Sequence, residues 1–181
     1  MPGHINCLEK QGHIEVYFGD EPGFSLNCVV PYCWQFPGEP VKILPQRGKT
    51  LNTLGFMKSD GATAATFSKE GSINAGFVIE SIDAWLQTLK KTTVLVLDNA
   101  PMHRAKIFQE RLAGWEEKGL YIFFLPAYSP HLNKIEILWR HCKYRWIKPQ
   151  DYRDLPTLKA ALDAIWSSFG EKYRVKFKEH N

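Results

Sequence analysis

The stretch TVLVLDNAPMHRA, residues 93–105, decides the fold of this protein. Residues 94–97 form an apolar run that is too short for a helix, and Asp98 follows directly after it. An apolar run of this length between turn-forming residues is typical of a strand buried on both faces of a sheet. Functional sites in open α/β sheets collect beyond the carboxyl ends of such strands. Asp98 therefore lies where a functional carboxylate is expected, although a turn-forming role explains a single aspartate equally well.

The rest of the sequence predicts strands first and then alternating helices and strands. Alternating apolar residues indicate strands in the first third of the chain, and Asp60–Gly61 is a hairpin signal. This order favours an α/β fold with one mixed sheet and helices on both faces. The predicted strands are 13–20, 25–32, 49–57, 62–67, 93–97 and 120–125, and the predicted helices are 73–89 (capped by Ser72), 105–118, 134–148 and 155–169.

The composition fits one globular domain. The chain has 181 residues, of which 44% are hydrophobic and 23% charged, so it can bury a substantial core. No apolar run reaches the roughly 18 residues that cross a bilayer, and the N-terminus has no signal-peptide pattern. The four cysteines match no zinc or redox spacing, which indicates free thiols. We expect a soluble, cytoplasmic protein.

Positive charge is concentrated in the last third of the chain. Residues 134–181 contain 11 Lys and Arg against 6 Asp and Glu, whereas the preceding residues are close to neutral. A basic region on a neutral body indicates an anionic partner, with nucleic acid as the first candidate. A solvated helical surface explains the same charges.

Two further acids occupy positions related to that of Asp98. Asp20 ends a predicted strand, and Glu136 lies in the first turn of a predicted helix. Asn133 and Glu136 also form a capping-box-like pattern, so a local role explains the glutamate too. Three converging carboxylates repel one another unless cations neutralise them. Two Mg²⁺ ions about 3.5–4 Å apart can activate a nucleophile and stabilise the leaving oxygen in phosphodiester cleavage or transfer.

Three separated motifs resemble those of DDE transposases. They are YFGDEPGF at 17–24, LDNAPMH at 97–103 and LPAYSPHLNKIEILW at 125–139, in the order that the family has them. The chain looks most like the bacterial insertion-sequence branch related to mariner elements, and the loop at 34–40 is similar to that branch. The resemblance covers residues 13–148.

The resemblance implies an RNase H-like fold with a mixed five-stranded sheet, and a catalytic, metal-binding triad. Motif by motif, the triad falls on Asp20, Asp98 and Glu136, with two Mg²⁺ or Mn²⁺ ions as cofactors. The 37 residues between Asp98 and Glu136 are similar to the family's usual spacing. Glu21 is the main rival for the first position, but on an extended strand its side chain should point to the face opposite that of Asp20.

Several polar residues near the triad have both a local and a functional interpretation. His103 suits the start of a helix and Asn133 suits a helix cap, and either could also orient the acids. Trp139 and Trp146, seven residues apart, indicate a core stripe. The candidates for orienting the acids or contacting DNA phosphates are Asn99, His103, His131, Asn133, Arg140 and Lys143.

The resemblance also bears on domain organisation and partners. Transposases of this kind are expected to carry helix-turn-helix modules before the catalytic domain, and this chain starts almost directly at the first catalytic strand. Two interpretations follow: the second half of a split or frameshifted transposase, whose helix-turn-helix half is encoded separately, or a decayed or excised catalytic domain. The predicted parts are a lead-in at 1–12, the catalytic domain at 13–148, and a C-terminal helix and basic tail at 149–181.

The sequence thus predicts metal-dependent DNA strand cleavage and strand transfer by a transposase catalytic domain. Its partners would be element ends and target DNA, with a homodimer assembled on the DNA. Two alternatives stay open. One is a plain RNase H-like nuclease, and the other is an inactive remnant that acts only as a DNA-binding or oligomerisation module.

Overall fold

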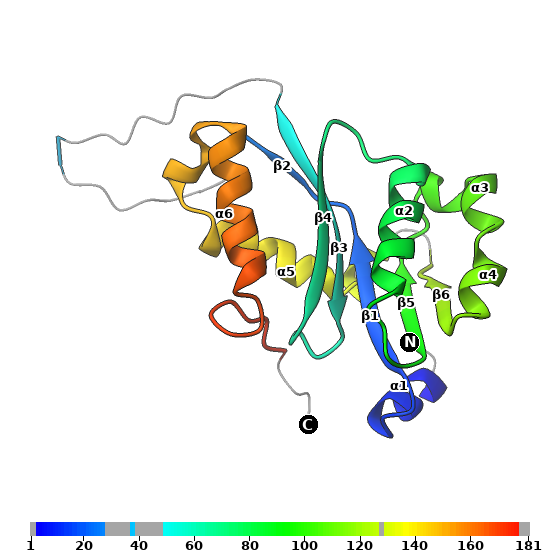
Figure 1. Cartoon of the computed structure of the whole chain (residues 1–181). Coiled ribbons are helices and arrows are strands. Elements are labelled where there is room, and N and C mark those ends of the chain that lie inside the picture. Colours follow the sequence, from blue (N-terminus) through cyan, green and yellow to red (C-terminus); the bar gives the residue numbers. More distant parts are fainter. Residues whose placement is uncertain (1–2, 28–36, 39–48, 127–128, 178–181) are drawn as a thin grey trace.

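One mixed sheet runs through the middle of the molecule (Figure 1). The computed structural model describes residues 3–27, 37–38, 49–126 and 129–177. Within these residues the sheet has six strands. They are β1 (Glu15–Asp20), β2 (Gly23–Ser25), β3 (Thr50–Lys58), β4 (Ala64–Glu70), β5 (Thr93–Leu97) and β6 (Leu120–Phe124). Strand β1 is antiparallel to β3 and parallel to β5, which is in turn parallel to β6. The other two strands, β2 and β4, pair antiparallel with β3.

Strands β1 and β2 together form one interrupted strand. Asp20 pairs with Gly55 and Gly23 pairs with Asn52, so both segments follow the same register along β3. The interruption spans two residues, and the Pro22 carbonyl still accepts a hydrogen bond from the Thr53 backbone N–H at 3.0 Å. Counted in this way, the sheet has the five strands that the resemblance to DDE transposases implies.

Helices cover both faces of the sheet (Figure 1). Helices α5 and α6 lie on one face, and α2, α3 and α4 lie on the other. A short helix, α1, precedes β1 within the stretch expected to be a simple lead-in. The helices are α1 (Gly3–Lys10), α2 (Ala75–Leu86), α3 (Lys106–Gln109), α4 (Leu112–Glu116), α5 (Ile135–His141) and α6 (Leu155–Ser167). The α/β fold class with helices on both faces is confirmed.

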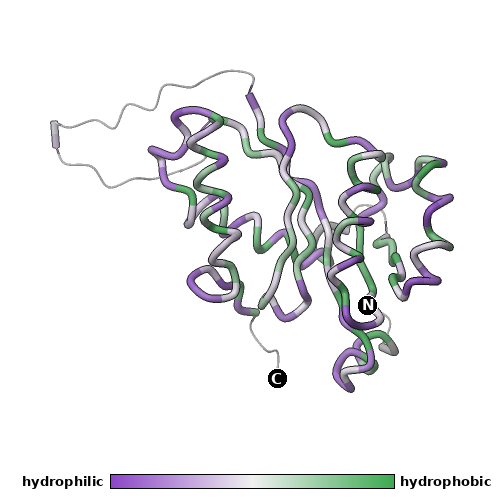
Figure 2. The backbone as a smooth tube through the Cα atoms, in the orientation of Figure 1, coloured by the Kyte–Doolittle hydropathy of each residue, from purple (hydrophilic) through white to green (hydrophobic). Residues whose placement is uncertain are grey.

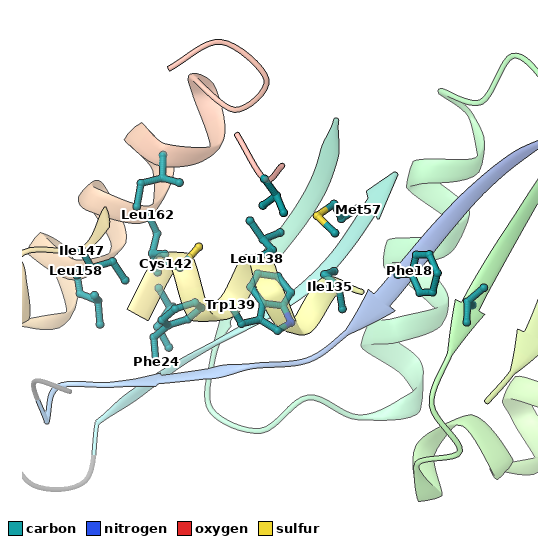
Figure 3. Close-up of a cluster of buried hydrophobic side chains, with 14 of the residues drawn as sticks. Phe18, Phe24, Met57, Ile135, Leu138, Trp139, Cys142, Ile147, Leu158 and Leu162 are labelled. Carbon is teal, nitrogen blue, oxygen red and sulfur yellow. The ribbon is translucent and has the colours of Figure 1, made fainter. Parts of the chain in front are cut away.

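The central strands separate two hydrophobic cores. Residues of β5 are buried throughout, and they alternate between the core under α5 and α6 and the core under α2. Figure 2 shows hydrophobic residues along this strand. Figure 3 shows the first core, where Trp139, Leu138 and Ile135 of α5 face β1 and β3. Because side chains of a strand alternate between faces, residue parity decides which core a residue joins.

The predicted helix 134–148 changes its hydrogen-bond pattern halfway. Helix α5 ends at His141, and a π-helical segment, Cys142–Trp146, follows. The Ile147 backbone N–H bonds to the Cys142 carbonyl at 3.1 Å, five residues earlier. A π-turn is wider than an α-turn, so residues after His141 leave the spacing that a continuous α-helix would give them.

Two other helices differ from the prediction. The 73–89 helix is capped by Asn74 instead of Ser72, since the Asn74 side chain accepts from the Phe77 N–H at 2.9 Å. The predicted helix 105–118 is divided into α3 and α4. Asp83 of α2 accepts hydrogen bonds from Arg111 at 2.5 Å and from the Trp115 indole at 2.8 Å, and these contacts hold α4 against α2.

Some predictions fall outside the described residues. These include residues 28–32 of the predicted strand 25–32, most of the loop at 34–40, and two of the cysteines, Cys28 and Cys33. Cys7 and Cys142 are free thiols, and burial raises the pKa of the Cys142 thiol. Within the ranges given above, no helix combines the length and the apolar character needed to cross a membrane.

Candidate active site

Asp20 and Asp98 lie at equivalent positions on two neighbouring parallel strands. Phe18 of β1 pairs with Val96 of β5, and both side chains join the core under α5 and α6. Two residues further along each strand come Asp20 and Asp98. Because side chains two residues apart share a face, both carboxylates lie at the carboxyl-end edge of the sheet on the face that α5 covers.

Helix α5 adds Glu136 to this edge. Glu136 lies in the first turn of α5, and Asn133, which precedes the helix, is buried. Asn133 does not cap the helix with its side chain. Instead its Nδ2 donates to the Gly19 carbonyl of β1 at 3.0 Å, which fastens the start of α5 to the strand that carries Asp20. The buried Oδ1 of Asn133 has no hydrogen-bond partner in the described part of the chain.

The three predicted acids line one pocket. Its volume is about 540 Å³, and its walls come from the ends of β1 and β5, the loop after β6 and the start of α5. Ser129 lies in the loop wall and Arg104 contributes a cation. The lining residues are Asp20, Asp98, Asn99, Ala100, Arg104, Leu125, Pro126, Ser129, Asn133 and Glu136.

The pocket disfavours the ionised form of Asp20. Burial, together with the neighbouring carboxylates of Glu21, Glu136 and Asp98, raises the pKa of Asp20 to about 7. Like charges at one site and removal from water both destabilise a carboxylate, and a bound cation reverses both effects. A set of oxygen donors with surplus negative charge suits a hard divalent cation.

Trp139 contacts Asp20 from the other side. Its indole N–H donates to Asp20 Oδ2 at 2.9 Å, and Trp139 stands three residues after Glu136, on the same side of α5. The ring lies directly over Gly55 of β3, where a Cβ atom would come within 2.4 Å of it. The glycine thus leaves room for the indole, and the helix that carries Glu136 also supplies the donor to Asp20. The sequence assigned Trp139 to the core only.

His103 forms a closed cluster beside the pocket. Its side chain is 0% exposed, its Nδ1 lies 3.0 Å from the Asp98 carbonyl and 3.2 Å from Asp98 Oδ1, and its Nε2 lies 3.0 Å from Glu21 Oε1. Although burial disfavours the imidazolium, the hydrogen bonds with Asp98 and Glu21 raise the pKa of His103 to about 10. Since a carbonyl oxygen only accepts hydrogen bonds, Nδ1 carries a proton.

Glu21, Asp98 and His103 are also a candidate metal cluster, because their ligand atoms all lie within 4.8 Å of one another. Because Nδ1 of His103 is protonated, Nε2, which lies 3.0 Å from Glu21 Oε1, is the ring nitrogen that could bind a metal ion. The imidazolium already compensates the Glu21 carboxylate at 3.0 Å. The cluster thus supports Asp98 through an ion pair, and it lies beside the pocket that Asp20, Asp98 and Glu136 line, so that Asp98 belongs to both groups.

The remaining predicted residues have different surroundings. Asn99 is exposed and lines the pocket, whereas His131, in the 3-10 turn Pro130–Leu132, is exposed and does not line it. Arg140 lines a second pocket further along α5. The Lys143 ammonium lies 5.5 Å from the centre of the Phe24 ring, away from both pockets. Sequence reasoning missed Arg104, whose only signal is its place next to His103.

The fold and the pocket define an RNase H-like catalytic domain with carboxylates at its strand ends. Residues 15–159 match the family model described as "DDE superfamily endonuclease", which is well over half of the chain. The chain belongs to the DDE superfamily.

Individual relatives agree with this assignment. The "Insertion element IS630 uncharacterized 39 kDa protein" of Shigella sonnei is 25% identical over 132 residues, covering 69% of this chain and 36% of that protein. The fold is similar to the chain in "Crystal structure of the Mos1 Strand Transfer Complex", with a TM-score of 0.59 at 20% identity over 92% of this chain and 53% of that one. The chain in "Crystal structure of the mariner Mos1 paired end complex with Mg" has a TM-score of 0.59 at 19% identity, and the match covers 85% of this chain and 48% of that one. The chain thus spans about a third to a half of these relatives.

Proposed function

We propose that this chain is the catalytic domain of a DNA transposase, which cleaves a DNA strand at an element end and joins the freed 3′ end to target DNA. One observation carries the proposal: Asp20, Asp98 and Glu136, from three separate elements, line one pocket. Membership of the DDE superfamily and the similarity to an insertion-element protein support it. The Mos1 structures are a strand transfer complex and paired end complexes, which supports DNA as the substrate.

In this proposal the three carboxylates hold two divalent ions, Mg²⁺ or Mn²⁺. The residues fit such ions, because the pocket has surplus negative charge at Asp20 and an unpartnered buried oxygen on Asn133. When bound, the ions activate a water or 3′-hydroxyl nucleophile and stabilise the leaving oxygen. Mos1 paired end complexes with Mg and with Mn support this choice of metals.

The side chains around the carboxylates fix their positions. Asp98 Oδ1 accepts from the Ala100 N–H at 3.0 Å and contacts His103, while Trp139 holds Asp20. Arg104 lines the pocket and is exposed, so its guanidinium is available to the non-bridging oxygens of the scissile phosphate. The chain therefore supplies rigid carboxylates on one side of the pocket and a cation on another.

The partners follow from the reaction. Transposition joins two element ends, so we propose a homodimer assembled on DNA, with end recognition supplied by a separate helix-turn-helix part. We further propose that residues 13–148 form the catalytic unit and that the C-terminal part from residue 149 belongs to the same domain, since Leu158, Leu162 and Ile165 of α6 join the core under α5. Asn99, which lines the pocket, and the exposed His131, in the turn Pro130–Leu132, are proposed DNA contacts.

The test is strand cleavage by the purified chain. A labelled duplex carrying the inverted-repeat end found beside the gene is incubated with Mn²⁺ or Mg²⁺, with the upstream DNA-binding part added where it is encoded separately. We expect nicks at the element end that require the metal and disappear in EDTA and in Asp98→Asn. Unchanged nicking by Asp98→Asn would contradict the mechanism.

Two controls separate the alternatives. A plain RNase H-like nuclease cleaves an RNA–DNA hybrid and shows no preference for the element end. An inactive remnant binds DNA equally well with and without chelator and shows no Mn²⁺ site in a soaked crystal. Metal-dependent nicking of the end, together with joining to a second duplex, excludes both.

A further inference from the structure

A second pocket lies further along α5. Its volume is about 630 Å³, and it is formed by α5, the π-helical segment and the chain after α6. The lining contains no acid and four permanent cations, with one aromatic ring beside them. The residues are Ile137, Arg140, His141, Tyr144, Arg145, Arg174 and Lys176.

Among the described residues, the cations of this pocket have no acidic partners. Some exposed charges elsewhere do form ion pairs, as in Lys159–Asp163 at 2.6 Å. By contrast, Arg140, Arg145 and Lys176 form no ion pair with any residue that the structure describes, and Arg174 bonds only to the Gly170 carbonyl. Burial, Arg145 and Arg140 lower the pKa of His141, as expected where positive charge is uncompensated.

The π-helical segment brings the cations together. Its wider turn aligns residues about five apart, so Arg145 joins Arg140 at the pocket, while Lys143 turns away to Phe24. Trp146 stacks on His141, with ring centres 5.3 Å apart. These contacts make the wall of the pocket a fixed structure.

The chain after α6 supplies the opposite wall. Val175 is 2% exposed and belongs to the core under α5 and α6, while Arg174 and Lys176 on either side of it are exposed. The ring of Tyr173 packs against Trp146 at 5.2 Å between centres. An extended chain anchored at alternate residues thus presents its two cations on one side.

We propose that this pocket binds the phosphodiester backbone of DNA whose reacting phosphate lies in the catalytic pocket, a statement that rests on the proposed function. Arg140 stands one helical turn from Glu136 and Arg145 nine residues from it, which is roughly 6 to 14 Å along the axis at 1.5 Å per residue. At 3.4 Å per nucleotide, this distance spans about two to four nucleotides of one strand. Guanidinium groups bind phosphate oxygens bidentately, and the exposed Tyr144 can stack on a sugar or base.

Duplex binding by the full chain, measured by fluorescence anisotropy in EDTA over a range of salt concentrations, tests this inference. The variant is Arg145→Ala with Lys176→Ala, and the control is Lys106→Ala with Lys118→Ala, which removes two exposed charges from α3 and the end of α4. Each lost phosphate contact lowers the slope of log K against log salt by about 0.9. We therefore expect a slope smaller by about 1.8 and affinity lower by about 50-fold near 0.1 M salt, with the control unchanged.

Several outcomes overturn the inference. Equal slopes for the variant and the control, no DNA binding by the wild-type chain in EDTA, or preferential displacement of DNA by polyglutamate would each do so, the last by indicating an acidic protein partner. Asp98→Asn should bind DNA normally and fail to nick it. If the wild type nicks but the pocket variant keeps its slope, only this inference fails; if the pocket variant loses binding while Asp98→Asn still nicks, only the proposed function fails.

Discussion

The adjacent carboxylates of Asp20 and Glu21 lie on opposite faces of the sheet and have opposite electrostatic surroundings. On the α5 face, Asp20 receives a hydrogen bond from the neutral indole of Trp139 and opens into a pocket with two other acids. On the other face, Glu21 is paired with the buried imidazole of His103 at 3.0 Å. Asp20 and Glu21 are thus adjacent in the sequence, but only the charge of Glu21 is compensated by a cation. Charge compensation, more than proximity, distinguishes a cation site from an ion-paired support.

The largest loss of activity is expected on substitution of Asp98, which both lines the pocket and contacts His103. Asp98→Asn keeps the shape of the side chain but removes a charge from the pocket and from the contact with His103. We expect metal-dependent nicking to fall by on the order of 10³-fold, since a metal centre contributes several kcal/mol to the transition state. The measurement is the initial nicking rate, with Asp163→Asn on α6 as the matched control. A control that loses as much activity as the variant would contradict the assignment.

Glu21→Gln should have a smaller effect of a different kind. It leaves the pocket acids in place but removes the counter-charge of a fully buried imidazole, so we expect unfolding free energy to drop by about 2 kcal/mol. Nicking should fall by about 10- to 100-fold, as is usual when the support of a ligand is lost. Urea unfolding and nicking rates measure the two effects, with Glu117→Gln as an exposed control. If Mn²⁺ binding is lost in Glu21→Gln but kept in Asp20→Asn, then Glu21 is the metal ligand and Asp20 is not.

Asp20→Asn should stabilise the chain when divalent ions are absent. Burial and the carboxylates of Glu21, Glu136 and Asp98 raise the pKa of Asp20 to about 7, so ionised Asp20 opposes folding. The wild type therefore loses stability as pH rises from about 4 through 7, and the variant does not. We expect the variant to be more stable by about 4 kcal/mol at pH 8 and nearly equal at pH 4. Urea unfolding in EDTA at both pH values tests this, and a destabilised variant at pH 8 would refute it.

The smallest effect is expected at Trp139. Trp139→Phe keeps an aromatic ring over Gly55 and removes the donor to Asp20, a loss of about 1 kcal/mol that corresponds to about fivefold in nicking rate. Trp166→Phe is a matched control, because the buried indole nitrogen of Trp166 has no hydrogen-bond partner among the described residues. Equal loss in both variants would mean that the ring matters and the hydrogen bond does not.

Local sequence patterns were sufficient to predict the order of the helices and strands and the strand ends that carry Asp20 and Asp98. The apolar run before Asp98, the alternation before Asp20 and the hairpin signal at Asp60–Gly61 each depend on neighbouring residues only, and the corresponding strands and turn are present. The proximity of Asp20 and Asp98 also follows, because parallel strands bring their carboxyl ends to one edge, whereas Glu136 reaches this edge through the packing of α5. Their catalytic role stays a prediction.

The details that sequence reasoning missed depend on contacts between distant elements. Asn133 has a capping pattern, yet its amide bonds to Gly19, 114 residues away in the chain. His103 has the pattern of a helix start, yet its partner is Glu21, 82 residues away. The choice of Asn74 over Ser72 as cap is decided by the path of the backbone, which is extended at Asn74 with φ −127° and ψ 170°. No local periodicity carries this information.

The π-helical segment has a consequence for chain length. A π-turn holds about one residue more than an α-turn, so the segment is equivalent to a single-residue insertion in an otherwise regular helix. Deleting Tyr144 would restore α-helical winding and rotate every later residue by about 100°. Trp146 would then lose its stack on His141 and its contact with Tyr173, and Arg145 would leave the pocket. At this place the length of the chain, rather than the identity of any one side chain, decides which residues line the second pocket.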